Sequence, residues 1–149
     1  MFSRNHKVVA ACLLAIAAIH ASSIFAASGF QVEVNVTDAL LKNPHSKLWK
    51  QDPSAGSPDY KYLVVGRRPD GAVMVLYRQP DLTNERKIRL SGALFKCGIK
   101  RDWPILFIDS AADVKKQLEH PFLDDPSHEG ISFMEGSDVA IVYQAVCGG

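Results

Sequence analysis

The side chains best suited to chemistry lie close together near the C-terminal end of the chain. Imidazole and carboxylate groups gather there in one short segment, which contains His120, Asp124, Asp125, His128 and Glu129. Such groups can hold Zn²⁺ or another divalent ion, and a histidine beside a carboxylate can act as a general base. The spacing matches no established ligand pattern such as H-E-x-x-H, and Pro121 and Pro126 interrupt the segment. We therefore interpret it as a solvated acidic loop, and we expect neither a metal ion nor another cofactor.

Charge is distributed unevenly along the chain. Residues 60–101 carry ten basic and three acidic side chains, a net charge of +7, whereas residues 102–149 carry two basic and nine acidic ones, a net charge of −7. The two halves either pack so that their charges pair, or present faces of opposite sign that steer a charged partner. The basic residues expected to contact such a partner are Arg86, Lys87, Arg89, Lys96, Lys100 and Arg101.

Nucleic acid is disfavoured as the partner of these basic residues. No row of aromatic side chains interleaves with them, and the chain after residue 27 is close to neutral overall. A protein with an acidic surface fits the same charge distribution better.

Two cysteines, Cys97 and Cys147, remain once the N-terminal segment with Cys12 is set aside. They lie far apart in the sequence and not as C-x-x-C, the spacing typical of redox enzymes. A structural disulfide is therefore predicted, which implies an oxidising compartment. It would close a loop of 51 residues.

Residues 1–27 follow the plan of a secretory signal peptide. Arg4 and Lys7 precede an unbroken apolar run over residues 8–19, and small residues follow as far as Ala27. We predict cleavage near Ala27, one globular domain over residues 28–149, and a bacterial protein that is periplasmic or secreted. No membrane span is expected after cleavage.

The same N-terminal segment allows two alternatives to a cleaved secretory signal. An uncleaved anchor over residues 8–27 would be long enough to span a bilayer of about 30 Å, but its strongly apolar part ends at Ile19. A lipoprotein would be cut before Cys12, yet the apolar run continues well past that residue. Both features favour the cleaved signal.

The periodicity of the remaining chain predicts the elements that must position these residues. Strands are expected over residues 30–36, 60–67, 72–78, 88–97, 105–108 and 139–146. A short helix is expected after Thr37, and a capping box at Ser110 and Asp113 predicts another helix through Glu119. The prediction is an α+β fold: a single antiparallel or mixed sheet of five or six strands, with one or two short helices packed against it and one disulfide. Pairing of the last strand with residues 88–97 would bring Cys147 beside Cys97.

The leading functional hypothesis is a small exported, non-catalytic binding protein, for example an inhibitor or immunity-type protein that acts on another protein of the cell envelope or extracellular space. One alternative is a small exported hydrolase that uses His120 and His128 with the nearby carboxylates. Another is an accessory subunit of a surface or secretion apparatus.

Overall fold

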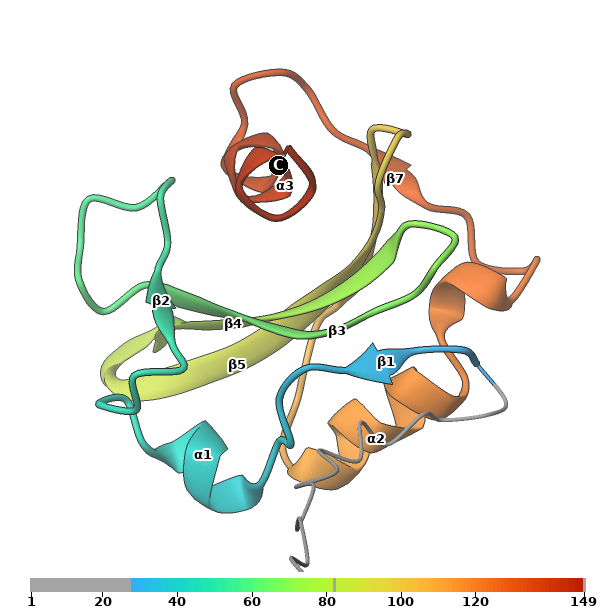
Figure 1. Ribbon diagram of the computed structural model, residues 1–149. Helices are drawn as coiled ribbons and strands as arrows, with labels where there is room; N and C mark the ends of the chain where they lie inside the picture. Colours follow the sequence, from blue (N-terminus) through green and yellow to red (C-terminus); the bar gives the residue numbers. More distant parts are fainter. Residues whose placement is uncertain (1–27, 82, 149) are drawn as a thin grey trace, which may run out of the picture.

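The computed structural model describes residues 28–81 and 83–148, apart from the side chains of Glu85 and Arg86. Within these residues, one antiparallel sheet of seven strands is combined with three α-helices (Figure 1). The strand order is β1-β3-β4-β5-β6-β7, and β2 pairs with β3 as well. This confirms the predicted α+β class and the single sheet. The strand number exceeds the prediction because β2 and β7, pairings of two residues each, were not predicted. The predicted signal peptide lies outside the described residues.

The strands are β1 (Gln31–Val32), β2 (Lys50–Gln51), β3 (Lys61–Arg67), β4 (Ala72–Asp81), β5 (Asn84–Lys96), β6 (Arg101–Ile105) and β7 (Ile131–Ser132). The α-helices are α1 (Asp38–Lys42), α2 (Ala111–Glu119) and α3 (Asp138–Cys147), and a 3-10 turn spans Phe122–Asp124. No helix in the described part of the chain is long and apolar enough to cross a membrane.

The hairpin of β3 and β4 forms the centre of the sheet, and its strands match those predicted over residues 60–67 and 72–78. Gly71 adopts a positive φ of 90°, which a residue with a side chain would resist. Both strands are apolar at nearly every position because both faces of the sheet are covered. In Figure 1, α3 lies over one face of the sheet, while α1 and α2 lie over the other.

Alternate side chains of the central strands enter two separate cores. Leu94 on β5 is fully buried in the core beneath α1 and α2, which also holds Trp49 and Leu118. Its neighbour Phe95 is fully buried in the second core, where it meets Val142 of α3. Each face therefore has its own apolar layer, and a residue's position in the strand decides which layer it joins.

The predicted last strand is wrong, because residues 138–147 form the helix α3. The Ser137 side chain caps this helix by accepting a hydrogen bond from the Ala140 N–H, and Asp138 occupies the first turn. Its buried positions, Ala140, Val142, Tyr143 and Val146, share one helical face. A short apolar run fits a buried strand and a buried helix equally well by pattern alone, and tertiary packing selected the helix here.

The Cys97–Cys147 disulfide is confirmed, although by a different route from the strand pairing that was predicted. Because α3 packs across the face of the sheet that holds Phe95, its last residue reaches the end of β5, and the two Cα atoms lie 5.4 Å apart. The bridge therefore joins the C-terminal helix to the central sheet.

Two other predicted strands differ in extent. The strand expected over residues 30–36 is reduced to Gln31–Val32, because the N–H groups of Glu33 and Val34 both donate to the Val65 carbonyl and the ladder ends there. The strand expected over residues 105–108 instead spans Arg101–Ile105. The predicted capping box opens α2 as expected.

Candidate functional site

The predicted histidine and carboxylate cluster does not come together as one site. His120 lies at the exposed C-terminal end of α2. His128 stacks on the Phe122 ring at a centroid distance of 4.7 Å, and its Nδ1 lies 2.9 Å from Asp125 Oδ2. Glu129 is exposed. Among residues 28–81 and 83–148, no three His, Cys, Asp or Glu side chains gather as metal ligands would.

Asp124 of that cluster belongs instead to an ion network around Arg68. The Arg68 guanidinium, whose side chain is 12% exposed, contacts both Asp70 and Asp124, with Nη1 2.5 Å from Asp124 Oδ2. Lys96 pairs with Asp70 in the same network. The hydrogen bond from Arg68 is the main reason that the pKa of Asp70 lies well below its usual range. This network ties the 3-10 turn to the β3–β4 hairpin, so Asp124 and Lys96 have structural partners.

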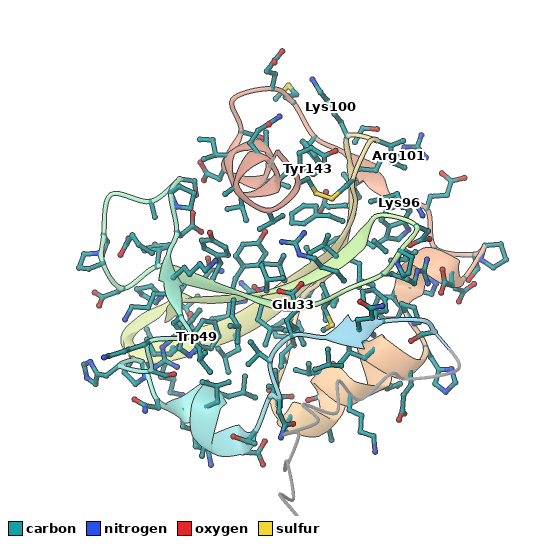
Figure 2. The ribbon with its side chains drawn as sticks, viewed as in Figure 1. Glu33, Trp49, Lys96, Lys100, Arg101 and Tyr143 are labelled. Atoms are coloured by element: carbon teal, nitrogen blue, oxygen red, sulfur yellow. A yellow bond between two sulfur atoms is a disulfide. The ribbon has the colours of Figure 1, made fainter. Side chains whose placement is uncertain are left out.

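The six predicted basic residues do not form one patch. Lys87 and Lys96 are nine residues apart on β5, about 30 Å along the strand. Arg89 is half-buried, with its guanidinium 5.1 Å from the centre of the Phe107 ring and its Nη2 donating to the Leu106 carbonyl. The Arg86 side chain lies outside the described residues. Lys100 and Arg101 are exposed at the opposite end of β5 from Lys87, where Figure 2 labels them.

Exposed apolar side chains accompany Lys100 and Arg101. Arg101 pairs in register with Ser132 of β7, which places two neighbouring segments side by side. Met134 is 81% exposed, Ile131 is 56% exposed and Ile99 is 47% exposed. We call this region the β6–β7 surface, and it consists of Ile99, Lys100, Arg101, Ile131 and Met134.

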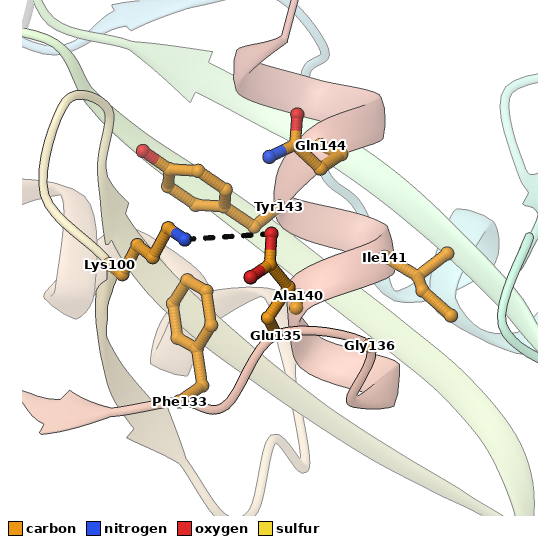
Figure 3. Close-up of a pocket in the computed structure, with 8 residues that line it drawn as sticks. All are labelled: Lys100, Phe133, Glu135, Gly136, Ala140, Ile141, Tyr143 and Gln144. Carbon is orange, nitrogen blue, oxygen red and sulfur yellow. Dashed lines mark ion pairs between the residues drawn. The ribbon is translucent and has the colours of Figure 1, made fainter.

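A shallow cleft of about 210 Å³ adjoins the β6–β7 surface (Figure 3). Phe133 and Tyr143 form its aromatic wall, and the Lys100 Nζ lies 3.9 Å from Glu135 Oε1 across it. The Tyr143 hydroxyl accepts a hydrogen bond from the Gly98 N–H, so the phenol also fixes the β5–β6 turn. The cleft therefore has a packed aromatic wall and a charged rim of exposed side chains.

A second concavity lies on the face of the sheet that α3 covers, and no sequence pattern indicated it. Two adjoining clefts, of about 460 Å³ and about 240 Å³, share Tyr77, Gln79 and Val139 as lining residues. Asp52 lines the larger cleft and Asp102 the smaller one. We call the two clefts together the α3 groove. Its lining residues come from the β2–β3 connection, β4, β5, β6 and α3, so their proximity exists only in the folded chain.

Two polar groups in the α3 groove, Tyr77 and Asp102, have raised pKa values. Burial raises the pKa of Tyr77, and the negative charges of Asp52 and Asp102 raise it further. Burial also raises the pKa of Asp102, which is 7% exposed. The Tyr77 hydroxyl is therefore protonated at physiological pH. The buried Asp102 carboxylate is unfavourable unless a hydrogen-bond donor or a cation pairs with it.

Comparisons with models of protein families, with curated proteins and with solved structures found no match for this chain.

Proposed function

We propose that this protein is an exported, non-catalytic binding protein that uses the β6–β7 surface to dock onto an acidic surface of another protein in the cell envelope or extracellular space. The observation that carries this proposal is the exposure of three large apolar side chains, Ile99, Ile131 and Met134, on the paired segments that also carry Lys100 and Arg101. Large apolar side chains that gather on a surface with a charged rim are typical of protein interfaces.

Burial of the apolar side chains of this surface would favour binding. Complete burial of an apolar side chain of this size is worth about 1.5 to 3 kcal/mol relative to full exposure. Met134 is 81% exposed and Ile131 is 56% exposed in the free protein. Contact with a partner would therefore remove a large part of their apolar area from water. Methionine also adapts its shape to a partner more readily than a branched side chain does.

The charges favour an acidic partner. Among the described side chains, no carboxylate lies within ion-pair distance of Arg101, and Lys100 meets only Glu135 at 3.9 Å, where both groups are largely exposed. An exposed pair of this kind contributes little to stability, so both cations are available to a partner. Complementary charge at the rim of an interface mainly accelerates association.

The predicted signal peptide and the disulfide support export, since disulfides persist in oxidising compartments. The absence of a predicted catalytic pattern around His120 and His128, and their position on exposed surface, favour binding over hydrolysis. An inhibitor, an immunity-type protein and an accessory subunit would all use such a surface, and the identity of the partner would distinguish them.

The proposal is tested with the full chain carrying a C-terminal affinity tag, used to capture proteins from an envelope extract of the producing organism. The captured protein is identified and purified, and its association rate with each variant is measured at low and at physiological ionic strength. The double variant Lys100→Glu/Arg101→Glu should slow association about tenfold or more and remove most of its salt dependence. Met134→Ser should mainly accelerate dissociation.

The matched control is Lys47→Glu/Lys50→Glu, which makes the same charge change at exposed positions before and in β2. It should leave both rates close to wild type, because Lys47 and Lys50 lie outside the β6–β7 surface. The fold should also be preserved, since exposed substitutions move stability by under about 0.5 kcal/mol. Unchanged association and dissociation rates in both Lys100→Glu/Arg101→Glu and Met134→Ser would refute docking at this surface. An enzymatic activity lost on removal of His120 or His128 would establish the hydrolase instead.

A further inference from the structure

The α3 groove exists because α3 covers only part of its face of the sheet. The helix packs on the end of the face that contains Phe95. Beyond its first residues the face continues along β4 and β5 with Tyr77, Gln79 and Ser91, which line the groove. In Figure 1 the segment between β2 and β3 rises on the same side of the sheet as α3 and forms the opposite wall.

Buried side-chain atoms without a hydrogen-bond partner line this groove, among them the Tyr77 hydroxyl oxygen and the Arg89 Nε. The Tyr77 hydroxyl oxygen is inaccessible to solvent and makes no hydrogen bond within the described chain. Asp102 is 7% exposed, and among the described residues only its own backbone N–H bonds its carboxylate. Buried polar groups are normally satisfied, so the orphan Tyr77 hydroxyl, in a groove that Asp102 also lines without a partner from another described residue, indicates that a ligand supplies the missing contacts.

The charge of the groove is negative. Asp52 and Asp102 lie near enough to the Tyr77 hydroxyl for both charges to act on it, and Asp138 of α3 lines the same wall. Arg89 is the one cation among the lining residues, and its guanidinium is held on the Phe107 ring, with Nη2 directed to the Leu106 carbonyl. No cationic side chain of the described residues therefore neutralises Asp102.

We propose that the α3 groove binds an organic ammonium group, which donates hydrogen bonds to the Asp102 carboxylate and the Tyr77 hydroxyl oxygen while its apolar stem lies along Val139. An ammonium group has three donors and no acceptor, which complements a carboxylate and a hydroxyl oxygen. The rings of Tyr60 and Tyr77 also line the groove and favour a cation over a neutral group. The ammonium group belongs either to a free amine or to a lysine side chain of a polypeptide.

The test is an NMR titration of the full chain, isolated from the cells that produce it, at constant ionic strength. The probes are n-butylammonium chloride, its neutral isostere n-butanol, and a lysine tripeptide blocked at both ends. Saturable amide shifts at Tyr77, Ser91 and Asp102 are expected with n-butylammonium, with affinity at least about tenfold above that of n-butanol. Equal binding of the blocked tripeptide would identify a lysine side chain as the source, and binding of n-butylammonium alone a free amine.

The variants separate the proposed contacts from general surface charge. Asp102→Asn should weaken n-butylammonium binding at least about tenfold, and Tyr77→Phe, which removes only the hydroxyl, should weaken it severalfold. Asp59→Asn is the matched control, because it removes an exposed carboxylate close to the groove in sequence and should leave binding unchanged. Tyr77→Phe decides the outcome if Asp102→Asn does not fold. Equal affinity for n-butanol, shifts that do not saturate, or full affinity in a folded Asp102→Asn or Tyr77→Phe variant would overturn the proposal.

Discussion

Removal of the Cys97–Cys147 disulfide should lower the free energy of unfolding by about 2 to 4 kcal/mol. The bridge joins residues 50 positions apart, and the chain-entropy relation gives about 4 kcal/mol for a loop of this length. That value is an upper figure, because the unfolded chain is more compact than the relation assumes. The fold itself should survive, since Val142 and Val146 still pack α3 against the sheet without the bridge.

The perturbation is the double variant Cys97→Ala/Cys147→Ala, which leaves no unpaired thiol at either end of the bridge. Urea unfolding is followed through tryptophan fluorescence, because Trp49 is buried in the core on the opposite face from α3 and therefore reports global unfolding. The midpoint should move to lower urea, and reduction of the wild-type protein with dithiothreitol should reproduce the shift. Dithiothreitol should have no effect on the variant.

Two results would refute this reasoning. Recovery of two free thiols from the denatured, unreduced wild-type protein would show that the bridge does not form. An unchanged unfolding midpoint in the double variant would show that the bridge does not constrain the unfolded chain.

Two further predictions concern charge. Arg68→Met should lower the free energy of unfolding by about 1 to 2 kcal/mol at pH 7, because it leaves the partly solvated Asp70 and Asp124 without their cation. Since the folded pKa of Asp70 is depressed, this loss should shrink in thermal unfolding as the pH falls below about 4. A loss that stays constant down to pH 2 would contradict the assigned pair. Asp102→Asn should raise the melting temperature at pH 7. Burial raises the folded pKa of Asp102, so its charged form destabilises the fold as the pH rises above about 4. A lower melting temperature at pH 7, or a gain that persists at pH 3, would contradict that assignment.

Local features of the chain were predictable because they depend on neighbouring residues. The β3–β4 hairpin follows from its Pro-Asp-Gly turn, and α2 follows from the capping box at Ser110. The Cys97–Cys147 pairing followed from counting cysteines, which requires no knowledge of topology. Each of these signals is complete within a few residues or has only one solution.

The conformation of α3 required the tertiary structure. Its sequence is rich in β-branched and aromatic residues, which favour strands when considered one by one. The cap at Ser137 and the available face of the sheet made the helix the better solution, because the helix buries Val142 and Val146 against Phe95. Intrinsic preference is a weak term beside such burial.

The candidate sites divide in the same way. The sequence by itself determined which side chains carry charge and that Lys100 and Arg101 are neighbours. Only the tertiary structure decided that Lys96 is engaged by Asp70, and that Lys87 and Lys96 lie about 30 Å apart along one strand. It also assembled the α3 groove around Tyr77 and Asp102, which are distant in sequence. The physical reason is that burial and ion pairing depend on contacts between distant segments, and no local pattern encodes those contacts.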